Sequence, residues 1–259
     1  MISAAGLLLA LAAVWHPAGP GASWSESRMA HDGPLAGVNV VVVRMDPRQL
    51  QFELDTATRD LGMTAAWTID RIPDRGVAAF NAGQFIGGVP WGWLVLNRVE
   101  QSAPGTGRLA MSFLVDGAGA ASLVTPEELP AVRARAHFAF QSYPMILSGK
   151  GEMPWELRGP DRGVSLTHRD SRLALGILPD GSVVVALTRF AIAGSAAGSL
   201  PWGPTVVEMA AFMRSIGCDR AMLLDGGISS QLAVRGADGD LKRWANWRPV
   251  PLAVIVARR

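Results

Sequence analysis

The sequence predicts an α+β fold, a single domain with a mixed, largely antiparallel β-sheet flanked by helices. Short apolar runs separated by turn signals dominate the chain, and Asp-Gly dipeptides join two pairs of these runs. One segment with helical periodicity leads directly into an apolar strand. With 259 residues, of which 49% are hydrophobic and 18% charged, the chain can bury a substantial core. No long linker or internal repeat follows Ser27, so we expect one domain over residues 25–259.

The first element is an uncharged apolar run, MISAAGLLLALAAVW. Its length fits the hydrophobic region of a secretory signal peptide and is short for a membrane-spanning helix. No Lys or Arg precedes the run and no clean A-x-A cleavage site follows it, so a terminal helix packed on the domain, or a misassigned start, stays an alternative. We expect residues 1–24 to be a signal-like segment, with a periplasmic or secreted location and only transient membrane contact.

Paired strands account for most of the following chain. The runs VNVVVVRMD and LQFELDT flank a turn at Asp46 and Pro47, a short helix is expected around residues 65–71, and a strand at 77–80. The segments 109–125 and 172–190 each place an Asp-Gly turn between two apolar runs. Each of these two segments is therefore expected to form a β-hairpin.

The best helix candidate is PTVVEMAAFMRSIGC, where Thr205 and Glu208 have the spacing of a capping box and Gly217 stands where a helix would stop. Its apolar positions follow the helical period: Val206, Met209, Ala210 and Met213. The strand AMLLD, at 221–225, follows at once. The chain closes on VPLAVIVARR, which is apolar through its middle and is expected to be a central strand.

Two of these strands end on polar residues and glycines. Asp225 ends the AMLLD strand and is followed by Gly226 and Gly227, which permit unusual backbone angles and expose amides to a ligand. Asn81 ends the strand at 77–80 in the same way. Asp-Gly is also a common turn dipeptide, so Asp225 as a mere turn residue stays an alternative. The pattern favours one cleft shared by both strand ends.

Four motifs in order, FNAGQF, RLALGILPDG, TVVEMA and AMLLDGGISSQL, resemble the phosphodiester glycosidases related to the enzyme that uncovers mannose 6-phosphate by removing N-acetylglucosamine. The resemblance runs from about Val38 to the C-terminus. The family's N-G-G-F pattern is matched by residues 81–84 and its D-G-G-G-S pattern by residues 225–229. Ala82, Gln84 and Ile228 depart from these patterns, which bears on the substrate more than on the fold.

The resemblance implies a hydrolase that cleaves a sugar 1-phosphodiester. The implied substrate is a small or polymeric glycan phosphodiester of a cell wall or exopolysaccharide. A phosphate ester leaves readily as an anion, so a cation near the phosphate matters more than strong protonation by an acid. Arg172 matches the family's Arg, and a guanidinium can hold two phosphate oxygens. Asp225 is the expected nucleophile or general base.

Glu208 has two interpretations. Its spacing makes it a capping-box residue bonded to the Thr205 backbone, and the family's T-x-x-E pattern makes it a second catalytic carboxylate beside Asp225. The residues expected to contact substrate are Asn81, Gly83, Gln84, Gln141, Arg172, Gly226, Gly227 and Ser229. Tyr143 is a weaker candidate.

Several classes of function are disfavoured. No run of Lys or Arg and no nucleic-acid motif is present, so no nucleic-acid partner is expected. Cys218 is the sole cysteine and the four His have no ligand spacing, so no metal or cofactor is expected. Two alternatives remain, a phosphodiesterase that attacks phosphorus and a non-catalytic polysaccharide-binding protein of the same fold.

Overall fold

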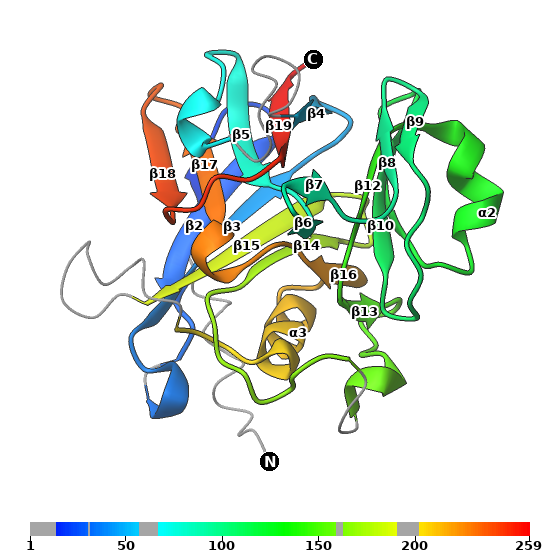
Figure 1. Ribbon diagram of the computed structural model, residues 1–259. Coiled ribbons are helices and arrows are strands. Elements are labelled where there is room, and N and C mark those ends of the chain that lie inside the picture. Colours follow the sequence, from blue (N-terminus) through cyan, green and yellow to red (C-terminus); the bar gives the residue numbers. More distant parts are fainter. Residues whose placement is uncertain (1–13, 31, 57–66, 159–162, 191–201) are drawn as a thin grey trace.

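The computed structural model describes residues 14–30, 32–56, 67–158, 163–190 and 202–259. The described residues form four sheets, of seven, five, five and two strands, in which every strand pair is antiparallel. The α-helices are short: α2 (Leu129–Val132) and α3 (Val206–Ser215). The protein is therefore mostly β (Figure 1). The predicted antiparallel pairing is confirmed, whereas the strands form several sheets in place of the expected single mixed sheet flanked by helices.

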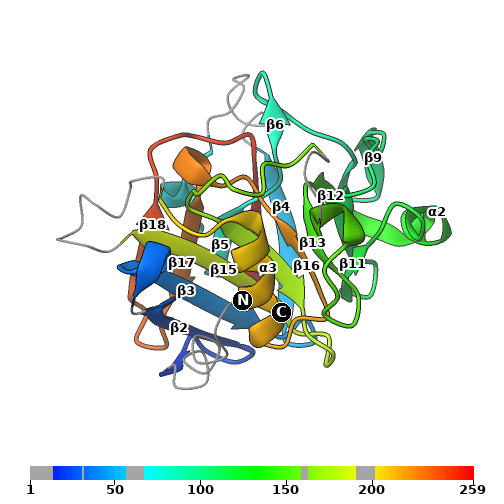
Figure 2. The same cartoon turned by 90° about the horizontal axis from the view of Figure 1, so that it is seen from below.

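The seven-stranded sheet contains one predicted hairpin and supports the main helix. Its strands lie in the order β1 (His16–Pro17), β2 (Ala22–Arg28), β3 (Val38–Met45), β15 (Val183–Phe190), β14 (Leu173–Ile177), β16 (Arg220–Leu223) and β13 (Met145–Ser148). The β14–β15 hairpin is confirmed. Helix α3 packs against β13 and β14 (Figure 2), and its predicted capping box is present. The domain boundary expected after residue 24 falls within β2, and residues 1–13 lie outside the described residues.

A five-stranded sheet contains the predicted central C-terminal strand. Its order is β18 (Leu241–Ala245), β17 (Gln231–Arg235), β5 (Gly76–Asn81), β19 (Leu252–Arg258) and β4 (Leu50–Thr56). Strand β19 lies between β5 and β4, which confirms its interior position. The strands that flank the turn at Asp46 and Pro47 do not pair, because β3 joins the seven-stranded sheet and β4 joins this one.

The other five-stranded sheet lies at the right of Figure 1, with α2 on its outer side. Its order is β11 (Ala121–Val124), β10 (Met111–Asp116), β12 (Ala136–Ser142), β8 (Leu94–Leu96) and β9 (Val99–Ser102). The predicted β10–β11 hairpin is confirmed. The two-stranded sheet pairs β6 (Phe85–Ile86) with β7 (Val89–Pro90). In the described part of the helix expected at 65–71, the chain forms a single 3-10 turn at Ile69–Arg71.

The three larger sheets share one hydrophobic core. The ring of Phe113 on β10 lies 5.9 Å from that of Phe52 on β4 and 5.6 Å from that of Phe140 on β12, measured between centroids. Val185 and Met222 bring the seven-stranded sheet into the same cluster. Burial of this apolar surface stabilises the packing of sheet on sheet. The strands surround the core themselves, which is why so few helices are needed to cover it.

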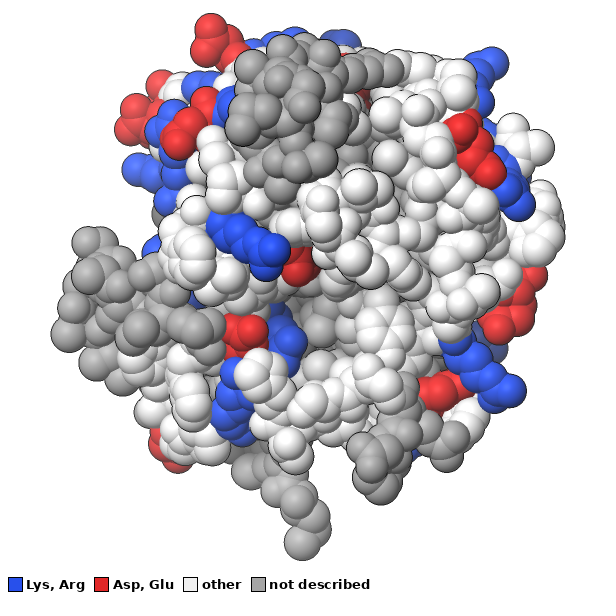
Figure 3. Space-filling model, in the orientation of Figure 1, with Lys and Arg blue, Asp and Glu red and all other residues white. Residues whose placement is uncertain are grey.

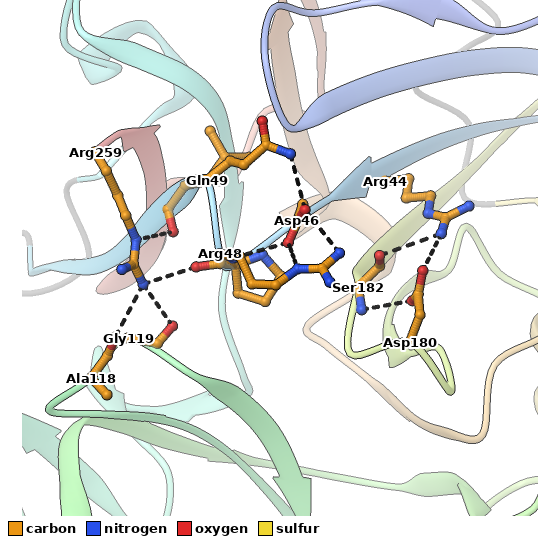
Figure 4. A network of polar contacts seen from close by, with 11 residues as sticks. Arg44, Asp46, Arg48, Gln49, Ala118, Gly119, Asp180, Ser182 and Arg259 are labelled. Atoms are coloured by element: carbon orange, nitrogen blue, oxygen red, sulfur yellow. Dashed lines mark hydrogen bonds and ion pairs between the residues drawn. The ribbon is translucent and has the colours of Figure 1, made fainter.

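Polar contacts of Arg259 join two of the sheets at their ends (Figure 4). The guanidinium donates to the carbonyl oxygen of Pro47 at 2.9 Å and to that of Ala118 at 3.2 Å. The connection between β3 and β4 is thereby tied to the β10–β11 turn. Within the described ranges, α3 and the shorter helices all lack the length and apolar character needed to cross a membrane.

Candidate active site

Three chain segments meet where the sequence predicts one cleft. The segments are the end of β5, the residues before β14 and the loop between β16 and β17. The Asp225 amide donates to the Ala82 carbonyl at 3.1 Å, and the Gly227 amide donates to the Ser171 carbonyl at 2.8 Å. The Asn81 side chain donates to the Asp225 carbonyl at 2.8 Å. These bonds fix the Asp225 loop against both neighbouring segments.

The loop after β16 requires glycine at two positions. A Cβ on Gly226 would lie 2.8 Å from the Ser171 carbonyl oxygen. Gly227 has a φ of +56°, and a Cβ there would lie 2.8 Å from a carboxylate oxygen of Asp170. Both contacts are too close for any side chain to be accommodated without movement. The two glycines therefore let the loop approach the segment before β14.

Asp225 occupies a half-buried position on this loop. Burial raises the pKa of its carboxyl, and the negative charge of Asp170 acts in the same direction. A hydrogen bond with Ser229 and the positive charge of Arg248 oppose that rise. Ser229, which the sequence predicts to contact substrate, is buried, and its hydrogen bond goes to the Asp225 carboxylate. Perturbed carboxyls of this kind are typical of catalytic sites.

Asp170 is a second carboxylate at the site, and it lies outside the four sequence motifs. One of its oxygens accepts a hydrogen bond from the Ser171 amide at 2.8 Å, and the other lies 3.7 Å from Nε2 of His168. Burial raises the pKa of the Asp170 carboxyl, against the opposing charge of Arg172. Asp170 stands two residues before the motif arginine, and that proximity is the signal that could have found it.

Two arginines bring positive charge to the two carboxylates. Arg172, predicted from the sequence, is half-buried, and its guanidinium donates to the carbonyls of Pro204 at 3.1 Å and His168 at 2.8 Å. Arg248, which no motif marks, is exposed and lies over the ring of Phe85, with 4.8 Å between Cζ and the ring centroid. Figure 3 shows acidic and basic side chains around a hollow near the middle of the face that Figure 1 presents to the viewer.

Glu208 has both of its oxygens engaged within the protein. One oxygen accepts from the Thr205 amide at 2.8 Å, completing the capping box, and Arg169 donates to both oxygens at 2.8 Å. Burial acts to raise the pKa of Glu208, but the hydrogen bonds from Arg169 and Thr205 outweigh it and the pKa lies below its ordinary value. These contacts favour the structural alternative that the sequence left open.

Asn81 and Gln84, predicted as substrate ligands, are used to hold backbone. Besides its bond to Asp225, Asn81 accepts from the Gln231 amide at 2.8 Å and is fully buried. Gln84 donates to the Tyr143 carbonyl at 2.5 Å and accepts from the Tyr143 amide at 2.9 Å. Both side chains therefore fix the backbone around the site.

Gln141 also holds the surrounding loops, and Gly83 lies close against its backbone. The side-chain oxygen of Gln141 accepts from the amides of Gly105 at 2.7 Å and Trp93 at 3.2 Å. A Cβ on Gly83 would clash with the Gln141 carbonyl oxygen. Among the described residues, no group of three or more His, Cys, Asp or Glu side chains is placed to hold a metal ion.

Gly83→Ala is expected to destabilise the protein by at least about 2 kcal/mol, because the added methyl meets backbone that cannot turn away. Urea unfolding of the two proteins measures the difference. Gly87→Ala is the control, since a Cβ there meets nothing within 4 Å and only its φ of +58° adds strain, about 1 kcal/mol. Equal stability losses would contradict the close approach at Gly83.

Comparisons with known proteins agree with this architecture. A family model described as phosphodiester glycosidase matches residues 74–257, which include Asp170 and Asp225. A search of curated protein sequences finds no match. The matched range covers all three segments that meet at the candidate site.

Solved structures share the fold at low sequence identity. A hypothetical protein from Synechocystis matches with a TM-score of 0.61 and 16% identity, over 92% of this chain and 62% of that one. The zebrafish N-acetylglucosamine-1-phosphodiester alpha-N-acetylglucosaminidase catalytic domain, auto-inhibited by its pro-peptide, matches with a TM-score of 0.63 and 14% identity, over 95% of this chain and 88% of that one. A putative exported protein from Burkholderia pseudomallei gives a TM-score of 0.53 and 14% identity, over 85% and 74%.

Proposed function

The chain belongs to the phosphodiester glycosidase family, and we propose that it is a hydrolase that cleaves the bond between a sugar and a phosphodiester. The observation that carries the proposal is the pair of carboxylates, Asp225 and Asp170, at a glycine loop flanked by Arg172 and Arg248. The name of the zebrafish relative supports a glycosyl 1-phosphodiester as the substrate class.

The proposed reaction breaks the bond between the anomeric carbon and the phosphate oxygen. The bonding electrons leave with the phosphate monoester, and an oxygen from water ends on the anomeric carbon. Asp225 either attacks that carbon or takes the proton of the attacking water, and Asp170 serves as the second carboxylate that such reactions use. Because phosphate is a stable anion, little acid assistance is needed at the leaving oxygen.

Positive charge at the site suits the anionic substrate. The exposed guanidinium of Arg248 is free to approach a phosphate from the solvent side, and Arg172 lies deeper, next to Asp170. Arginine can bind two phosphate oxygens at once, and the bound negative charge grows on the leaving group as the bond breaks. The two arginines would therefore stabilise the transition state more than the ground state.

The proposed setting is a cell-wall or exported polysaccharide, in the periplasm or outside the cell. The apolar, uncharged run in the first 15 residues resembles the hydrophobic region of an export signal. Fractionating cells that express the full chain, with and without that run, tests the location. Retention of both forms in the cytoplasm would contradict it.

Hydrolysis of a model glycosyl phosphodiester in isotopically labelled water tests the function. Release of free sugar with the label on the anomeric carbon is the expected result. Label in the phosphate would instead identify a phosphodiesterase that attacks phosphorus. Binding of the substrate without any release would identify a non-catalytic binding protein.

Glu208→Gln is expected to leave turnover within about twofold of the wild type, because its contacts are internal. Glutamine still completes a capping box, but the Arg169 ion pair is lost, at a cost of about 1 kcal/mol. Initial rates and urea unfolding on one preparation measure both. A hundredfold rate loss at unchanged stability would return Glu208 to the catalytic residues.

A further inference from the structure

We propose that a pocket beside the candidate active site binds a further sugar ring, so that the substrate is an oligomeric or polymeric glycan phosphodiester. This aromatic pocket has a volume of about 360 Å³ and is lined by Gly107, Arg108, Leu109, Tyr143, Trp155 and Glu156. Its volume is within the range of small-ligand sites, about 300–1,000 Å³. The proposal rests on the proposed function, since it extends the substrate of that reaction.

Tyr143 connects the aromatic pocket to the candidate active site. Its backbone amide and carbonyl are both held by Gln84, three residues beyond Asn81. The residue before it, Ser142, donates to the carbonyl of Leu223, two residues before Asp225. A substrate whose phosphodiester lies at Asp225 therefore has the aromatic pocket on the neighbouring loop.

Trp155 supplies a flat apolar surface in the aromatic pocket. Its side chain is 51% exposed although it is one of the largest hydrophobic residues, and Arg108 lies 6.0 Å from the ring centroid. Trp155 begins the short 3-10 helix Trp155–Arg158, which is anchored in the protein by buried Leu157. An indole held by a fixed turn and left half-exposed offers a stacking platform at low entropic cost.

The lining of the aromatic pocket matches the chemistry of a sugar. The apolar C–H face of a pyranose packs on an aromatic ring, while its hydroxyls need donors and acceptors around the edge. Arg108 supplies donors and Glu156 supplies acceptors within the same pocket. A purely apolar ligand would leave both charged groups without compensation.

A second pocket lies next to the aromatic pocket, which favours a chain over a single ring. This second pocket, of about 490 Å³, shares Gly107 and Arg108 with the aromatic pocket. Thr106, Glu127 and Arg133 supply further hydrogen-bonding groups there. The two pockets are therefore neighbours, as binding of a glycan longer than one unit requires.

The test compares glycosyl phosphodiesters whose other ester is either a monosaccharide or the corresponding tetrasaccharide. We expect the wild type to have a kcat/KM about tenfold higher on the tetrasaccharide ester, chiefly through KM, and Trp155→Ala to lose that preference while acting normally on the monosaccharide ester. Trp155→Phe should keep part of it. Val99→Ala, at another exposed apolar residue (58%) outside both pockets, is the control and should change nothing.

Equal kcat/KM on both esters in the wild type, or an unchanged preference in Trp155→Ala, would overturn the proposal. Calorimetric binding of phosphate-free tetrasaccharides of glucose, mannose and N-acetylglucosamine tests the pocket proposal independently of the proposed reaction. If no phosphodiester is hydrolysed but a tetrasaccharide binds and Trp155→Ala abolishes that binding, the pocket proposal is supported and the proposed hydrolysis is contradicted. If none of these tetrasaccharides binds and none of their esters is preferred, the pocket proposal fails by itself.

Discussion

Asp225→Asn is expected to lower kcat by at least about a hundredfold, the usual order for removing a nucleophile or general base. The backbone contacts of residue 225 with Asn81 and Ala82 do not involve the carboxylate, so the loop should keep its shape. The amide oxygen of asparagine can still accept the hydrogen bond from Ser229. Initial rates and thermal melting on the same preparation measure the effect.

The same substitution is expected to raise the stability of the fold at neutral pH. Because burial raises the folded-state pKa of Asp225, the native protein binds more protons than the unfolded chain as pH rises from the ordinary carboxyl pKa to the raised one. Stability therefore falls with pH across that window, and the ionised carboxylate is a cost at neutral pH. Removing the charge removes that cost, at the expense of activity.

Asp180→Asn is the matched control for this result. Asp180 lies in the β14–β15 turn, where hydrogen bonds from Ser182 hold the pKa of its carboxyl below the ordinary value. The pKa shift of Asp180 is opposite in sign to that of Asp225, so the ionised Asp180 stabilises the fold at neutral pH. Loss of this charge should therefore lower the melting temperature slightly and leave turnover unchanged. Unchanged turnover in a well-folded Asp225→Asn variant would remove Asp225 from the mechanism.

Asp170→Asn is expected to lower kcat by about a hundredfold and to move the acidic limb of the pH–rate profile to lower pH. The negative charge of Asp170 helps to raise the pKa of Asp225, so its removal lets Asp225 ionise at lower pH. A residue that only shapes the loop would not shift that limb. Rates measured from acid to neutral pH show the shift directly.

Two results would contradict the role given to Asp170. A normal kcat with an unshifted acidic limb in Asp170→Asn would show that the charge of Asp170 does not act on the Asp225 carboxylate. A slow variant with a lowered melting temperature and an unmoved limb would make Asp170 a structural residue of the glycine loop. In that case its contact with Gly227 would account for the whole effect.

Local features of the fold could be predicted from the sequence, and the assembly of sheets could not. The capping box at Thr205 and the turns of the β10–β11 and β14–β15 hairpins are encoded within a few residues, so their patterns suffice. The sheet that a strand joins depends on partners far along the chain. Strands β3 and β4 flank one short turn, yet each pairs in a different sheet.

Some residues of the candidate site could likewise be predicted from the sequence, and others could not. The approach of the Asn81 and Asp225 segments was predicted because each of these residues ends an apolar strand, and Arg172 was predicted from the family resemblance. Arg248 reaches the site through tertiary contacts with no spacing pattern of its own, and Asp170 is marked only by its place two residues before Arg172. Sequence also gives no sign that the amides of Asn81 and Gln84 are taken up by backbone groups.

The claim that Asp170 and Asp225 act as one catalytic pair is tested most directly by the kcat of the double variant Asp170→Asn/Asp225→Asn. Groups that act on the same step lose their effects together, so the double variant should be within a few-fold of the slower single variant, roughly as found for other catalytic sets. Multiplication of the two single losses, to about ten-thousandfold, would contradict the pair and show that the carboxylates act independently.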